Sequence, residues 1–132
     1  MRYHLPMPRL SEQRFMELVA DALDSLPHEF RKRMKNVAVL VENLPPESPR
    51  RLPRPRGMVS HGPLMLGQFI GTPATKKSVF DLSAGPDRVI LYQRNIEAVC
   101  GSEAEIQQQI RLTVIHEVGH YFGLSEDELR HV

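Results

Sequence analysis

Residues 102–126 read SEAEIQQQIRLTVIHEVGHYFGLSE, and this stretch decides the fold. Ser102 and Glu105 have the spacing of a capping box, in which each side chain pairs with a backbone N–H at the start of a helix. Behind this start, apolar residues recur every fourth position and neighbours broaden the stripe: Ile106, Ile110, Val114 and Val118, with Leu112, Ile115 and Phe122. The sequence therefore predicts a helix that is buried on most sides. The polar residues between His116 and His120 interrupt this pattern and need partners.

These polar residues form the pattern H-E-x-x-H, from His116 to His120. Residues four apart lie about 40° apart around a helix axis, so both imidazoles project to one side and can share a single tetrahedral zinc ion. Glu117 lies roughly 100° from His116, beside the metal, where it can hold a zinc-bound water and take its proton. The alternative is a pair of surface histidines on an ordinary helix.

A zinc site of this kind needs a third protein ligand. The sequence ends at Val132, so we expect that ligand close behind His120. Gly123 is a natural helix stop, because glycine can take the left-handed conformation that turns the chain. A turn there can bring Glu126 back towards the histidines, whereas a continuous helix would point it away. Asp127, Glu128 and His131 are the rival ligands.

With these residues the chain resembles the small bacterial zincin-like metallopeptidases, or minimal zincins, whose signature is HExxHxxGxx followed by Asp or Glu. The resemblance runs from about Leu10 to the C-terminus and is strongest over residues 86–92 and 116–129. It implies an α+β, zincin-like fold, a small mixed sheet packed on a C-terminal active-site helix. It also implies that His116, His120 and Glu126 bind Zn²⁺ and that Glu117 is the general base. The methionine turn and the propeptide of larger metzincins are not visible in the sequence.

The function expected from this site is that of a zinc metallopeptidase acting on a peptide or protein substrate. In zincins generally, an extended peptide pairs with a sheet edge above the helix, and Leu64–Ile70 or Arg88–Tyr92 could supply that edge. Candidates for stabilising the oxyanion are Tyr92, Tyr121, Arg130 and His131.

Two other functions stay open. A metal-dependent endoribonuclease with H-x3-H-x5-ligand spacing is compatible with His116, His120 and position 126. Its third ligand would be histidine, however, where this chain has Glu126. A non-catalytic zinc-stabilised module is the other alternative, favoured if Asp127 or His131 closes the site as a fourth ligand.

The length of the chain predicts one domain over residues 1–132. Ser11 starts an N-terminal helix whose apolar stripe is closed by Pro27: Phe15, Leu18, Val19, Ala22 and Leu26. Val37–Val41 predicts a buried strand, and Leu64–Ile70 and Arg88–Tyr92 predict two more. Residues 44–63 hold six of the 11 prolines and several arginines, which favours a surface loop.

The composition restricts the partners and the cellular compartment that we expect. The net charge of +1 gives nucleic acid little to bind, and residues 97–132 are acidic. Cys100 is the single cysteine, so an internal disulfide and a cysteine-rich zinc ribbon are excluded, and we expect a small, partly buried residue there. The sequence has neither an apolar run of about 18 residues nor a signal-peptide pattern. We therefore expect a cytoplasmic protein without a membrane partner.

Overall fold

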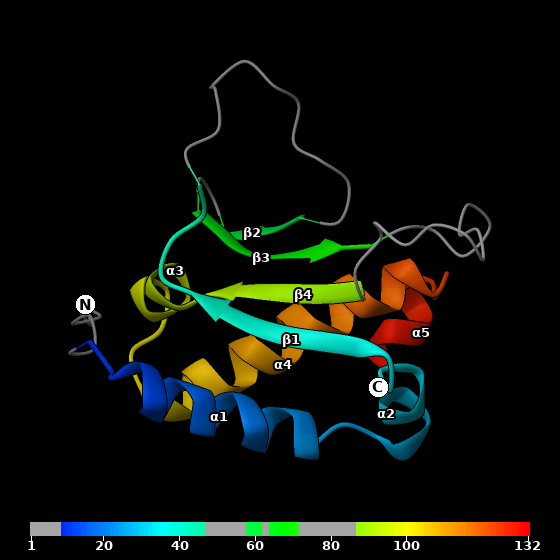
Figure 1. Cartoon of the computed structure of the whole chain (residues 1–132). Helices are drawn as coiled ribbons and strands as arrows, with labels where there is room; N and C mark the ends of the chain where they lie inside the picture. The colour runs from blue at the N-terminus through cyan, green and yellow to red at the C-terminus, as the bar shows by residue number, and fades with distance from the viewer. Residues whose placement is uncertain (1–8, 47–57, 62–63, 72–86) are drawn as a thin grey trace, which may run out of the picture.

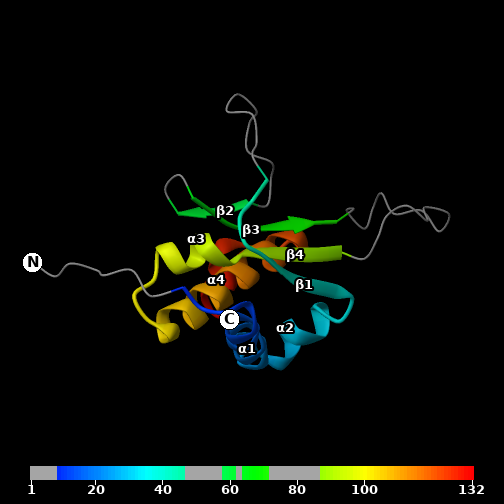
Figure 2. The same ribbon diagram turned by 60° about the vertical axis from the view of Figure 1, so that its left-hand side comes forward.

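The computed structural model describes residues 9–46, 58–61, 64–71 and 87–132 (Figure 1). In chain order the elements are α1 (Glu12–Asp24), α2 (His28–Arg33), β1 (Val37–Glu42), β2 (Met58–His61), β3 (Leu64–Ile70), β4 (Asp87–Tyr92), α3 (Gln93–Ala98), α4 (Glu103–Tyr121) and α5 (Glu126–Arg130). The strands form one layer, α4 packs on one face of it, and α1 packs along α4 (Figures 1 and 2). This α+β arrangement confirms the predicted fold class, including the N-terminal helix.

The described strands form one mixed sheet in the order β1-β4-β3-β2. β1 runs parallel to β4, with Val37 opposite Asp87 and Glu42 opposite Tyr92. β3 is antiparallel to both β4 and β2. The prediction that Arg88–Tyr92 supplies a free edge is wrong, because β4 is an interior strand. For β3 the prediction stays open, because β2 pairs only as far as Gln68 and, among the described strands, Phe69 and Ile70 pair with β4 alone. In this part of the chain the edges are β1 and β2.

The strand β2 lies inside the region that the sequence predicts as a loop, so that prediction is wrong for Met58–His61. Prolines exclude central strands, but this segment contains none and pairs on one side with β3. Residues 47–57 and 62–63, which carry the remaining Pro/Arg-rich sequence, lie outside the described residues. The strand over Val37–Val41 is confirmed, yet it is only partly buried. Val37, Val39 and Val41 pack against the core, whereas Leu40 is 44% exposed, because successive side chains of a strand point to opposite faces of the sheet.

The N-terminal helix α1 follows its predicted pattern. The Ser11 side chain accepts a hydrogen bond from the Arg14 N–H and so caps the helix. The predicted apolar stripe is buried and joins the common core: Phe15, Leu18, Val19, Ala22 and Leu26. An ion pair of 2.6 Å between Arg14 and Glu103 links the exposed side of α1 to the start of α4.

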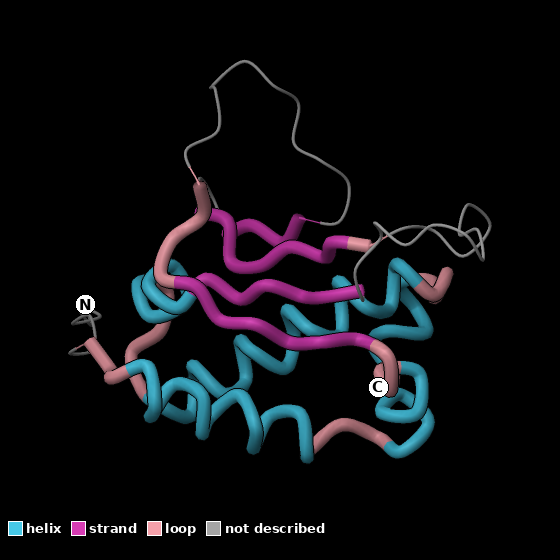
Figure 3. Tube along the Cα trace, viewed as in Figure 1, coloured by secondary structure: helices cyan, strands magenta, loops and turns pink. Residues whose placement is uncertain are grey.

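The helix α4 is the central element, lying between the sheet and α1 (Figure 3). Ser102 Oγ accepts the Glu105 N–H at 3.1 Å, as predicted. The Glu105 carboxylate, however, accepts the Gly101 N–H at 2.7 Å, one residue earlier than in a capping box. The predicted stripe of Ile106, Ile110, Val114 and Val118 is fully buried. Among the described residues, no helix is both long and apolar enough to cross a bilayer.

Candidate metal centre

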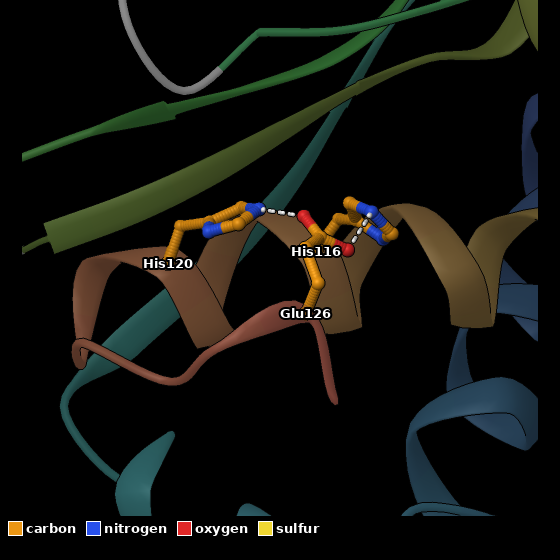
Figure 4. A group of neighbouring side chains, drawn as sticks. All are labelled: His116, His120 and Glu126. Carbon is orange, nitrogen blue, oxygen red and sulfur yellow. Dashed lines mark ion pairs between the residues drawn. The ribbon is translucent and has the colours of Figure 1, made fainter. Parts of the chain in front are cut away.

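The structure brings together the three predicted ligands, His116 and His120 near the end of α4 and Glu126 at the first residue of α5 (Figure 4). The His120 Nε2 lies 2.9 Å from Glu126 Oε1, and the His116 Nε2 lies 3.4 Å from Glu126 Oε2. One donor atom from each residue lies within 4.8 Å of the other two. The side chains are 44%, 47% and 58% exposed, so an ion or a substrate reaches them from solvent.

Gly123 produces the turn that returns Glu126 to the histidines, as predicted. Its φ of 79° lies in the left-handed region that favours glycine. The Gly123 N–H donates to the His120 carbonyl at 3.0 Å, and the Leu124 N–H donates to the Gly119 carbonyl at 2.9 Å. These two bonds form a Schellman motif, which ends α4 and reverses the chain within three residues.

The rival ligands do not join this group. Ser125 and Glu128 form a full capping box at the start of α5, so the Glu128 carboxylate is occupied by the Ser125 N–H and hydroxyl. Within the residues that the structure describes, neither Asp127 nor His131 reaches the group formed with Glu126. The fourth coordination position is therefore left open by this part of the chain, which is typical of catalytic rather than structural zinc sites.

Glu117 lies on the neighbouring face of α4, as predicted from its 100° offset. Thr113 one turn before it packs opposite Gly67 of β3, and Tyr121 one turn after it stacks on Phe69 of the same strand at 4.3 Å. Residues four apart share a helix face, so Glu117 faces β3 between these two contacts. Its side chain is 2% exposed. The two histidines point to solvent, whereas the carboxylate beside them is shielded from it.

The predicted oxyanion candidates Tyr92, Tyr121 and Arg130 make different contacts in the structure. Tyr92 is 1% exposed and its hydroxyl donates to Gln68 Oε1 at 3.3 Å, while burial, aided by the negative charge of Glu42, raises the pKa of this phenol. The Tyr121 hydroxyl donates to Asp87 Oδ2 at 3.1 Å. Both phenols thus donate hydrogen bonds within the fold, Tyr92 from a buried position and Tyr121 from a partly buried one. Arg130 stays beside the ligand group, because its Nε donates to the Glu126 carbonyl at 3.4 Å.

Cys100 is buried and forms no disulfide. Burial, with a contribution from the Glu105 charge, raises the pKa of its thiol to about 11. At neutral pH the thiol is therefore protonated, whereas a metal-binding cysteine is a thiolate. This agrees with the prediction of a small buried residue ahead of the helix.

The donor set fits Zn²⁺ on chemical grounds. Two imidazole nitrogens and one carboxylate oxygen are the ligands that zinc takes in catalytic sites, with a further position left for water or substrate. The hard cations Mg²⁺ and Ca²⁺ prefer sets made of oxygen alone. The residues present thus favour zinc or a similar transition metal.

The comparisons with known proteins concern the fold and the family of the chain. A conserved hypothetical protein from Thermo thermophilus has a similar solved structure, with a TM-score of 0.52 and 21% sequence identity. The match covers 85% of this chain and 94% of that one, and at this identity it supports the fold alone. No protein of curated function matches the chain. The family model described as zincin-like metallopeptidase matches residues 34–132, and the chain belongs to this family.

Proposed function

We propose that this protein is a zinc-dependent metallopeptidase that hydrolyses peptide bonds in a peptide or protein substrate. The observation that carries the proposal is the open three-ligand group of His116, His120 and Glu126 beside the buried Glu117. Membership of the zincin-like family supports the same reaction class. A reducing, cytoplasmic setting is part of the proposal and is supported by the free, protonated Cys100.

The chain's own residues have distinct roles in this reaction. His116, His120 and Glu126 would hold a zinc ion, which when bound would supply a Lewis acid for the scissile carbonyl and for the attacking water. Glu117 takes the proton of the attacking water and then delivers it to the leaving amine. Burial of Glu117 against β3 suits this role, because the shielded carboxylate keeps a fixed position next to the ligand face.

An extended substrate pairs most simply with β2. Peptides commonly add as a further strand to an exposed sheet edge. Among the described strands, β3 packs on α4 at Gly67 and Phe69, and β2 is the edge strand next to it. The β1 edge is separated from β3 by β4. β2, together with Phe69 and Ile70 of β3 beyond its end, is therefore the proposed substrate-binding edge.

The alternatives receive less support. An endoribonuclease would need a surface for phosphate, while the whole chain has a net charge of only +1. It would also leave Glu117 unused. A structural zinc module is expected to have four protein ligands. Among the described residues, three are brought together.

The test is zinc analysis of the purified protein and of Glu117→Gln, combined with cleavage assays on a peptide library and on RNA. We expect one zinc per chain in both proteins and a loss of peptide cleavage in Glu117→Gln by a factor of about 10²–10⁴, the usual contribution of a general base. Gln108→Ala, an exposed substitution on the same helix, is the control and is expected to cleave like the wild type.

Two results would contradict the proposal. The first is stoichiometric zinc without cleavage of any peptide, which supports the structural module. The second is peptide cleavage by Glu117→Gln at the wild-type rate, which removes Glu117 from the reaction. Cleavage of RNA that depends on the histidines would support the endoribonuclease instead.

A further inference from the structure

The short helix α5 contacts α4 through one buried side chain, Leu129, which is 6% exposed. Leu129 lies against Gly119, the residue before the second histidine of the motif. A Cβ built on Gly119 would overlap Leu129 Cδ2 and would lie 3.2 Å from its Cγ and 3.4 Å from its Cδ1. There is thus no room for a methyl group at position 119 while Leu129 is in place.

The two glycines near the histidines serve different purposes. Gly123 has a positive φ and is needed for its conformation. Gly119 has ordinary helical backbone geometry within α4, so glycine is needed there because it has no side chain, not because of its conformation. Its carbonyl also accepts the Leu124 N–H at 2.9 Å. Gly119 therefore contacts the returning chain in two ways. Its carbonyl accepts the Leu124 N–H, and Leu129 occupies the place where a side chain at position 119 would lie.

This contact bears on Glu126. Glu126 and Leu129 are three residues apart on α5 and so lie on the same face of the helix, the face directed at α4. The Glu126 side chain is 58% exposed, and the ion pairs that the structure records for it are with the two imidazoles. A helix of five residues is not stable alone. The position of the Glu126 carboxylate therefore depends on how Leu129 holds α5 against α4.

We propose that Gly119 and Leu129 form a positioning contact that sets the third metal ligand, Glu126, against His116 and His120. The inference rests on the proposed zinc site and deepens it. If Gly119 carried a methyl group, the Leu129 side chain would be displaced from α4, because α4 itself is packed between α1 and the sheet. Leu129 is the buried residue of α5, so its displacement loosens the helix that carries Glu126. Glu126 would then move away from the histidines, and the ion would lose its third ligand or bind it in poorer geometry.

The test is the zinc dissociation constant, measured by competition with a chromophoric chelator. We expect Gly119→Ala to weaken zinc binding by about 10–100-fold, as is usual when residues that orient metal ligands are changed. Leu129→Ala removes the anchor without adding bulk to α4 and is expected to act in the same direction. It keeps the inference testable if Gly119→Ala does not fold. Gln108→Ala is the control and is expected to bind zinc like the wild type.

A double-mutant cycle with Glu126→Ala separates positioning from a general effect on the fold. If Gly119 acts through Glu126, Gly119→Ala changes the dissociation constant of the Glu126→Ala protein by less than about twofold. An equal loss in both backgrounds would overturn the inference, as would wild-type affinity in Gly119→Ala. If the wild-type protein itself binds no zinc, the proposed function fails, and the two failures are thereby distinguished.

Discussion

The close approach of α4 to the sheet at Gly67 leads to a prediction for stability. A Cβ on Gly67 would lie 2.7 Å from Thr113 Cγ2 and 3.1 Å from the Ile90 carbonyl oxygen. Overpacking of this kind costs about 1–3 kcal/mol. Replacing glycine in a strand returns about 0.5–1 kcal/mol, because the unfolded chain loses freedom. The midpoints of these two ranges differ by about 1.3 kcal/mol, so we expect Gly67→Ala to lower the free energy of unfolding by about 1–2 kcal/mol.

This loss is measurable as a change in the melting temperature. Unfolding entropy near 60 °C is about 2.1 cal/mol/K per residue, or about 0.28 kcal/mol/K for a chain of 132 residues. The expected decrease is then about 4–7 °C. Urea unfolding followed by far-ultraviolet circular dichroism gives the free energy directly, provided that the dependence on urea is the same in both proteins.

Thr113→Ser is the matched variant, because it removes Cγ2 and keeps the hydroxyl that accepts a hydrogen bond from Gln109 Nε2 at 3.3 Å. Alone it is expected to cost about 1 kcal/mol for the lost methyl group. In the double variant the methyl group introduced at position 67 takes the vacated space. The double variant should therefore lose about 1 kcal/mol less stability than the sum of the two single losses. Simple additivity, or a Gly67→Ala protein as stable as the wild type, would refute the reasoning.

Two further predictions concern groups outside the ligand set. Tyr121→Phe removes the hydrogen bond to the buried Asp87 at 3.1 Å and is expected to cost about 1–2 kcal/mol in urea unfolding; an unchanged midpoint would contradict this. Burial raises the pKa of Cys100 from 9.0 to about 11, so the thiol ionises first in the unfolded chain and stability decreases as the pH rises from 9 to 11. The ultraviolet absorbance of the thiolate, taken as the difference from Cys100→Ser, should titrate with a midpoint near 11 in the native protein and near 9 in urea, and identical profiles would disprove the shift.

Elements with strong local signals could be predicted from the sequence. α1 and α4 begin at Ser11 and Ser102, each of which accepts a backbone N–H three residues later, and their apolar residues repeat with the helical period. The return of Glu126 was also predictable, because Gly123 alone supplies the left-handed turn. In each case the residues that determine the structure are close together in the chain.

The order of the strands was not predictable in the same way. β1 pairs with β4 across some fifty residues, and no residue of either strand specifies that neighbour. β2 has four residues between proline-rich segments and becomes a strand through its pairing with β3. α2, α3 and α5 have five or six residues each, too few for a helical period to appear.

The roles of the two tyrosines could not be predicted from the sequence, for a related reason. A phenol can stabilise an oxyanion or close an internal hydrogen bond, and the choice depends on partners from other elements. Tyr92 meets Gln68 of β3, and Tyr121 meets Asp87 of β4. The tight fit of Gly119 under Leu129 is likewise invisible in the sequence, since it depends on the path of the chain after Gly123.

The three ligands all come from the stretch between His116 and Glu126, so an ion there joins only the end of α4 to α5. Segments with few buried contacts open locally, at a much smaller free energy than global unfolding. α5 is such a segment, because Leu129 is its buried residue. Opening of α5 removes one ligand and leaves both histidines on an intact helix. If the proposed zinc ion is bound here, we expect its release to be helped by this local opening, which can occur while the sheet and core stay folded.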